Sequence, residues 1–352
     1  MRKYIHLFGG DRDKVVLGGA SAGGSSVVYH MMRGNWTEKP LFRGVVVSSV
    51  AFGTVLTQRE AGYQFENLVA KVGCAVEEPV ACLRNMTARE LVKSEETVPF
   101  PGAGERPLYM WGPVVDGEVV KEGPFSAFRG GRVVQVPAVF GVVTNDGTRF
   151  APKGLRDRGG ANGFLRDQFP GVGVRQLARL NRLYPNRNGS CPEEGCWWRQ
   201  ASDVYGELRY VCPSLFVTTR LRGLGVKRVF GYRWDVEDPV QMGSGLGVPH
   251  TVEVNAIFGP ENVNGSAPVS YYRNGTNAGA VEAVQGYWAS FIRTLDPNRY
   301  RLAGSAKWET WDGGDKGRLL FGTGGHTGME SIDDDLAERC EYWESIAADL
   351  SQ

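Results

Sequence analysis

The stretch from Gly19 to Gly23, which reads Gly-Ala-Ser-Ala-Gly, constrains the fold of this chain more than any other feature. Val15 to Leu17 predict a buried strand that runs directly into it, and a helix-like segment follows it. That segment keeps helical spacing at Gly24, Val27, Val28 and Met31. A strand that enters a helix through so short a turn exposes its apical residue, Ser21, when small residues flank the turn. We therefore predict a strand-turn-helix unit with Ser21 at the turn and the Ala22 amide at a helix N-terminus, where it can donate to an oxyanion.

The GxSxG pattern alone is not specific. With 48 glycines in the chain, it is expected by chance roughly 0.4 times in a sequence of this length. A glycine-rich turn of an ordinary α/β protein is therefore the alternative. A dinucleotide-binding turn is excluded, because the spacing GxGxxG is not present at positions 18–24.

Apolar runs typical of buried strands alternate with helical segments, which predicts an α/β fold with a mostly parallel sheet and helices on both faces. The strands are expected at Val15–Leu17, Val45–Val47, Ala138–Val143, Val226–Trp234 and Arg318–Phe321. Helices with a core-facing stripe are expected over 61–72 and 281–295. Residues 151–205 are rich in Gly, Arg and Asn, and we interpret them as an insertion with one short helix near Leu177–Leu183. A single domain over residues 1–352 is the simplest organisation.

The charge balance excludes several classes of partner. Forty Lys and Arg against 39 Asp and Glu leave a formal charge of +1, so no basic surface for nucleic acid or anionic membrane is expected. No apolar run approaches the ~18 residues of a transmembrane segment. The zinc-binding spacings CxxC and HxxxH do not occur in the sequence.

Sequons and cysteines favour an oxidising, secretory compartment. Chance gives roughly one or two N-x-S/T sequons, whereas the chain has five, at Asn35, Asn85, Asn188, Asn264 and Asn274. Two close cysteine pairs, Cys74 with Cys82 and Cys191 with Cys196, suit short disulfide loops, while Cys212 and Cys340 are assigned no partner. The N-terminus, MRKYIHLFGG, lacks the apolar core of a signal peptide. We give the sequons and cysteines more weight and predict an extracellular protein.

A serine hydroxyl needs a base, itself oriented by a carboxylate, to act as a nucleophile at neutral pH. After a turn serine of this kind the acid and then the histidine follow in the chain, which excludes His6. His30 lies nine residues beyond Ser21 on the next helix, too far along to fold back, and His326 lies in a glycine-rich loop. His250, in GLGVPHTVE, is therefore the candidate base.

The candidate acid is Asp146. The carboxylate of such a triad leaves the end of a strand between the serine and the histidine, and the apolar run AVFGVV ends at Val143, just before the turn Asn-Asp-Gly. A plain turn is the alternative reading of this motif.

Six segments in order resemble the type-B carboxylesterase and lipase family, which includes the cholinesterases, and most closely its fungal members. They are IHLFGGDRDKVVLGGASAGG, LFRGVVVSSV, the loop from Cys74 to the CLR at Cys82, VVTNDGTRF, GVPHTVEVNAIFG and YWASFIRTLDPN. The resemblance covers essentially the whole chain and implies the α/β-hydrolase fold.

The resemblance also implies the site residues. Ser21 matches the nucleophile, His250 the general base and Asp146 the orienting acid, and Ala22 matches one oxyanion-hole donor. Glu253 and Ser49 match positions that support the acid and the base. The implied reaction is hydrolysis of a small-molecule or lipid carboxylic ester through an acyl-serine, without a metal or organic cofactor. No oligomeric state follows from the sequence.

The chain departs from the family pattern in three places. The family usually has Glu where Asp146 stands, and its cholinesterases have Glu where Ala20 stands, which argues against a cationic substrate. The family's glycine-rich oxyanion loop lies well upstream, whereas only twenty residues precede Ser21. We therefore expect an N-terminally incomplete form that lacks the strands flanking Val15–Leu17, leaving an apolar sheet edge. Each missing oxyanion donor would remove about 2.7 to 4 kcal/mol of transition-state stabilisation.

A non-catalytic binding or adhesion module is the alternative function, because some relatives in this family have lost the serine. Retention of all three triad residue types disfavours it.

Overall fold

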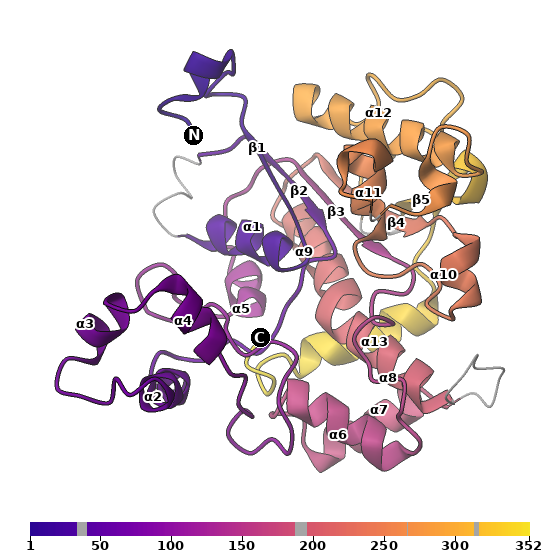
Figure 1. Ribbon diagram of the computed structural model, residues 1–352. Coiled ribbons are helices and arrows are strands. Elements are labelled where there is room, and N and C mark those ends of the chain that lie inside the picture. The colour runs from indigo at the N-terminus through magenta and orange to yellow at the C-terminus, as the bar shows by residue number, and fades with distance from the viewer. Residues whose placement is uncertain (34–40, 187–195, 266, 313–316) are drawn as a thin grey trace.

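A six-stranded sheet forms the centre of the described structure (Figure 1). The computed structural model describes residues 1–33, 41–186, 196–265, 267–312 and 317–352. Strands β1 to β5 pair in parallel, in chain order, and β6 pairs antiparallel with β5 at the edge. The strands are β1 Val16–Ala20, β2 Gly44–Ser48, β3 Ala138–Val143, β4 Val229–Asp235, β5 Arg318–Gly322 and β6 Thr327–Glu330.

Helices cover both faces of this sheet, because side chains alternate along the strands. On β2, Val45 and Val47 pack into one apolar cluster and Val46 packs into another. The first cluster contains residues of α1 (Ala22–Met32), α5 (Pro124–Arg129) and α9 (Cys212–Gly223). The second contains residues of α11 (Val252–Phe258) and α12 (Ala278–Thr294). The predicted α/β fold with a mostly parallel, doubly covered sheet is confirmed.

The segment that the sequence predicted as a largely irregular insertion is helical. It contains α6 (Arg158–Gln168), α7 (Val174–Leu183) and α8 (Cys196–Gly206), so the prediction of one short helix was wrong. These helices bury an apolar cluster of their own, which includes Phe164, Leu180 and Tyr205. The many Gly and Arg residues hid the helical period, and the Asp157 side chain caps α6 by accepting a hydrogen bond from the Gly160 amide.

The predicted core stripe over 61–72 is only partly buried. Helix α2 (Gly62–Lys71) buries Val69, whereas the side chain of Phe65 is 38% exposed. Figure 1 shows α2 with α3 (Pro79–Arg84) and α4 (Ala88–Ser94) at the periphery, away from the sheet. An amphipathic stripe there finds less apolar surface to contact than the stripe on α12, which is buried.

The remaining elements are short, apart from α13. They are η1 Ile5–Phe8, α10 Pro239–Gly243, η4 Pro260–Asn262, η5 Val269–Tyr271, η6 Thr323–Gly325 and α13 Asp334–Ser345. Residues Glu207–Val211, between α8 and α9, form a π-helical segment, η3.

One edge of the described sheet carries a strand that was not predicted from the sequence, and β1 lies at the other edge. Strand β6 was not predicted, because its residues, TGME, carry little β signal. In the described residues β1 pairs with β2 alone, and its residues are half-buried except for the exposed Gly18.

Two disulfides are present in the described residues. One joins Cys74 and Cys82, and the other joins Cys212 on α9 to Cys340 on α13, a pairing that the sequence did not assign. The predicted pair of Cys191 and Cys196 lies outside the residues whose side chains the structure describes. Of the sequons, Asn85, Asn264 and Asn274 are exposed, and Asn35 and Asn188 lie outside the described residues. None of the described helices has the length and apolar character needed to cross a membrane.

Candidate active site

Ser21 lies between the end of β1 and the start of α1, in a backbone conformation that L-residues rarely adopt. Its φ is 56° and its ψ is −125°. The Ser21 amide donates to the Ser48 carbonyl oxygen at 2.9 Å, and the Ser21 carbonyl accepts from the Ser25 amide at 3.0 Å. These bonds tie the turn to β2 on one side and to α1 on the other. A strained serine fixed in this way is typical of a nucleophile at a strand-to-helix turn.

The two glycines of the GxSxG pattern have different steric roles. A Cβ atom on Gly19 would lie 2.3 Å from the Gly23 carbonyl oxygen, a distance that no side chain tolerates. A Cβ atom on Gly23 would have nothing within 4 Å. A third glycine, Gly24, is also confined, because its Cβ would lie 2.9 Å from Cγ1 of Val47. The close approach of β1 and α1 therefore requires Gly19 and Gly24 more than Gly23.

Asp146 and His250, which are 104 residues apart in the chain, are in direct contact. His250 Nδ1 and Asp146 Oδ1 are 2.6 Å apart, and both residues are buried. The second carboxylate oxygen of Asp146 accepts from the Ser49 hydroxyl at 3.0 Å and from the Val143 amide at 3.2 Å. Three donors therefore hold this carboxylate in one orientation toward the imidazole.

The turn that carries Asp146 and the loop that carries His250 are joined by their backbones. The Asn145 amide donates to the Val248 carbonyl at 3.0 Å, and the Val248 amide donates to Asn145 Oδ1 at 2.8 Å. At Gly247, φ is +67° and a Cβ atom would lie 2.0 Å from Asn145 Oδ1. The contact between Asn145 and Gly247 therefore fixes the distance between the two loops.

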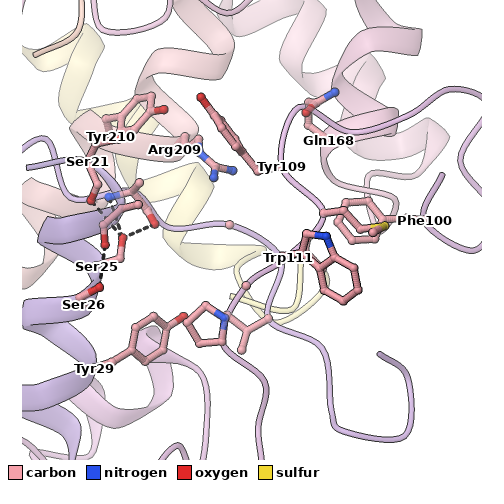
Figure 2. Close-up of a pocket in the computed structure, with 18 residues that line it drawn as sticks. Ser21, Ser25, Ser26, Tyr29, Phe100, Tyr109, Trp111, Gln168, Arg209 and Tyr210 are labelled. Carbon is pink, nitrogen blue, oxygen red and sulfur yellow. Dashed lines mark hydrogen bonds between the residues drawn. The ribbon is translucent and has the colours of Figure 1, made fainter. Parts of the chain in front are cut away.

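Two aromatic rings pack on His250. The rings of Tyr210 and His250 are tilted against each other with centroids 4.3 Å apart, and Tyr210 also lines the cavity that contains Ser21 (Figure 2). The ring of Phe150 contacts His250 edge-on at 5.1 Å. His250 Nε2 is buried and accepts no hydrogen bond from any described residue, including Ser21. Neither ring was assigned a role from the sequence. Phe150 is the last residue of the segment VVTNDGTRF, whereas nothing in the local sequence distinguishes Tyr210 from a core aromatic residue.

Glu253 and Ser49, which the resemblance placed beside the acid and the base, are both buried near Asp146. Glu253 is fully buried on α11 and accepts a hydrogen bond from the Tyr232 hydroxyl at 3.4 Å, while Tyr232 also bonds the Ser48 hydroxyl at 2.7 Å. Burial, and secondly the nearby charge of Asp146, raise the pKa of Glu253 to about 8. Glu253 is therefore a neutral acid at pH 7. Its partner Tyr232 was not predicted from the sequence.

The cavity beside Ser21 has a volume of about 360 Å³ and is open to solvent (Figure 2). Most of its lining residues are aromatic or apolar: Ala22, Tyr29, Ala51, Val55, Phe100, Tyr109, Met110, Trp111, Pro113 and Tyr210. Trp111 lines this cavity, whereas Phe125 and Tyr205 are core residues. Ala22 is the first residue of α1, so its amide is one of the helix N–H groups without an intrahelical acceptor.

Known proteins resemble this chain in sequence and in fold. Residues 1–343 match the model of the carboxylesterase family. A protein named secreted lipase 4, from Gibberella zeae, is 24% identical over 360 residues, which cover 97% of this chain and 62% of that protein. The chain therefore spans less than two thirds of the length of this relative.

A solved structure agrees with this match. The crystal structure of Aspergillus niger EstA superposes with a TM-score of 0.93 and 31% identity, over 100% of this chain and 67% of that one. The family match extends over nearly the whole chain. We conclude that the chain belongs to the carboxylesterase family.

Proposed function

We propose that this chain carries the catalytic residues of a serine ester hydrolase, with Ser21 as nucleophile, His250 as general base and Asp146 as the orienting acid. The observation that supports this most strongly is the state of His250. Its Nδ1 is bonded to a carboxylate, and its Nε2 is buried without a partner in the described residues. A carboxylate at Nδ1 favours the tautomer that leaves Nε2 free to take a proton.

The reaction proceeds in two acyl-transfer steps. Ser21 Oγ attacks the ester carbonyl carbon while its proton passes to His250 Nε2, and the Ala22 amide donates to the oxyanion that forms. Collapse of this intermediate breaks the bond to the alcohol oxygen, which leaves with the proton from His250. Water then attacks the acyl-serine and gives a proton to His250. The bond between the acyl carbon and Ser21 Oγ breaks, Ser21 Oγ takes the proton back from His250, and the carboxylic acid is released.

The substrate that fits this site is a carboxylic ester with an apolar portion. The aromatic cavity next to Ser21 supplies the contact surface, and the similarity to a protein named secreted lipase is consistent with a lipid or small-molecule ester. That similarity, the two disulfides and the exposed sequons at Asn85, Asn264 and Asn274 support an extracellular enzyme that is glycosylated at those positions.

Hydrolysis of p-nitrophenyl butyrate, combined with labelling by a fluorophosphonate probe, tests the proposal. We expect turnover and phosphonylation of the peptide that contains Ser21, and loss of both in Ser21→Ala. Ser345→Ala, which changes an exposed serine far along the chain, is the matched control and should retain both. Equal background rates and no labelling in all three proteins would favour a non-catalytic binding module.

A further inference from the structure

The cavity beside Ser21 contains a cation that has no acidic partner. Among the described residues that line it, Arg209 is the only one with a charged side chain. Arg209 forms no ion pair with any described Asp or Glu, and its Nε is buried without a hydrogen-bond partner in this part of the chain. Figure 2 shows its guanidinium between the wall that carries Ser21 and the ring of Tyr109.

Aromatic rings hold this guanidinium in place. Its central carbon lies 5.4 Å from the ring centroid of Tyr109, 5.7 Å from that of Tyr205 and 6.0 Å from that of Tyr210. Such rings offset part of the cost of removing a cation from water, but they do not neutralise it. The backbone at Gly53 leaves little free space on one side, because a Cβ atom there would lie 3.0 Å from an Arg209 terminal nitrogen.

The local backbone explains why an arginine is directed into this cavity. Arg209 is the middle residue of the π-helical segment Glu207–Val211. A π-helical turn inserts one extra residue into a helix and changes the direction of the side chains beside it, and such turns are frequent at functional sites. The next residue, Tyr210, packs on the imidazole of His250, so the guanidinium lies one aromatic ring away from the proposed base.

We propose that Arg209 is a specificity-determining residue that binds a carboxylate on the ester substrate. This inference rests on the proposed hydrolase function and names its substrate class: carboxylic esters that carry a second, ionised carboxyl group. Arg is suited to this task, because its planar guanidinium can donate two parallel hydrogen bonds to a carboxylate. The absence of any acidic side chain among the described lining residues removes competition for that cation.

Paired substrates of nearly equal shape test this preference. Mono-p-nitrophenyl glutarate carries the carboxylate on the acyl side, and methyl p-nitrophenyl glutarate is its neutral counterpart. The butyrate ester of 4-hydroxybenzoate carries the carboxylate on the alcohol side, and the butyrate ester of methyl 4-hydroxybenzoate is its neutral counterpart. We expect a lower KM for the anionic member of at least one pair.

Substitution of Arg209 separates recognition from packing. In Arg209→Gln the KM for the preferred anionic ester should rise by about 10- to 100-fold, as expected for loss of a hydrogen bond to a charged group. Any change in the kcat and KM for the neutral ester should be smaller, so that the preference for the anionic ester falls. Arg209→Lys should restore part of that preference because it keeps the charge. Arg175→Gln, at an exposed position on α7, is the control and should change neither substrate. A purely structural role predicts equal losses for both members of each pair.

Binding without turnover keeps this inference separate from the proposed catalysis. Calorimetry on Ser21→Ala compares two amides that cannot be turned over: the mono-p-nitroanilide of glutaric acid and the methyl ester of that anilide. The anilide with the free acid should bind more tightly, and this difference should be lost in the double variant Ser21→Ala, Arg209→Gln. Equal binding of the two anilides, together with equal KM values within both ester pairs, would overturn the role of Arg209. Preferential binding without any ester turnover would instead support Arg209 and refute the catalytic proposal.

Discussion

Replacement of Glu253 by Gln should change how the stability of the protein depends on pH. Glu253 is fully buried beside Tyr232 and near Asp146, and its pKa rises from the ordinary 4.5 to about 8. Gln has the volume of the protonated acid and cannot ionise. The substitution therefore keeps the packing and removes the titration.

The sign and size of the effect follow from proton linkage. Below pH 4.5 the carboxyl of Glu253 is protonated in both the folded and the unfolded chain, so its contribution is fully present. Above that pH the unfolded chain releases the proton and the folded protein retains it, so stability falls until the pH passes about 8. Between pH 5 and pH 8 this loss amounts to a few kcal/mol, on the order of 1 kcal/mol for each tenfold change in proton concentration.

Urea unfolding of the wild type and Glu253→Gln at pH 5, 6, 7 and 8 measures this contribution. We expect the wild type to lose a few kcal/mol more than the variant over this range, roughly 2 to 4 kcal/mol by the linkage above. Glu261→Gln, at an exposed acid in η4, is the control and should follow the wild type. If wild type and Glu253→Gln change in parallel to within about 1 kcal/mol, Glu253 is not a neutral buried acid and the reasoning fails.

Three further predictions concern the turn at Ser21, the two disulfides and Asp146. Gly19→Ala should destabilise the fold by about 2 kcal/mol or more in urea unfolding, because the added Cβ atom would collide with the Gly23 carbonyl oxygen. Gly23→Ala should cost under about 1 kcal/mol, because a Cβ atom there has nothing within 4 Å. Similar losses in the two variants would contradict these different steric roles. Removing the disulfide that closes 128 residues should cost about 5 kcal/mol, and removing the one that closes 8 should cost about 2.5 kcal/mol, in unfolding of double Cys→Ala variants. The reverse order would refute the chain-entropy account. Asp146→Asn should lower kcat for p-nitrophenyl butyrate by about 10⁴-fold, and a change below about tenfold would exclude its role as the orienting acid.

The strand-turn-helix unit and the sheet were predictable from the sequence because their signals are local and strong. Five apolar runs marked β1 to β5, and the predicted range Ala138–Val143 is the observed β3 without change. Strand β6 was missed because its four residues become a strand only by pairing with β5. Helices α6 and α8 were missed because their apolar residues pack against one another and against Trp343 from α13, far along the chain, whereas α7 contains the predicted short helix.

Motif order and resemblance placed Asp146 and His250 in one site, but local sequence could not reveal what surrounds them. Tyr232 lies on a buried strand and Tyr210 in a π-helical turn, and each contacts a site residue only in the folded chain. The same holds for Arg209, because its sequence context, GELRYV, does not show that no acid faces it.

The register of the first three strands determines the geometry of the candidate site. Ala20, Ser48 and Gly141 are aligned across β1, β2 and β3, and neighbouring strands lie about 4.8 Å apart. Ser21 and Ser49, the next residues on β1 and β2, both have positive φ, 56° and 46°, so two adjacent strands turn sharply at the same level.

Each such residue costs on the order of 1 to 3 kcal/mol unless its surroundings impose the conformation. Here the imposing bonds run from strand to strand, since the Ser21 amide bonds the Ser48 carbonyl and the Ser49 amide bonds the Gly141 carbonyl. The Ser49 hydroxyl then bonds Asp146 just beyond β3. A change that shifts β1 against β2 would therefore move Ser21 and also loosen the support of the carboxylate bonded to His250. The sheet, and not only the histidine, thus couples the proposed nucleophile to the proposed acid.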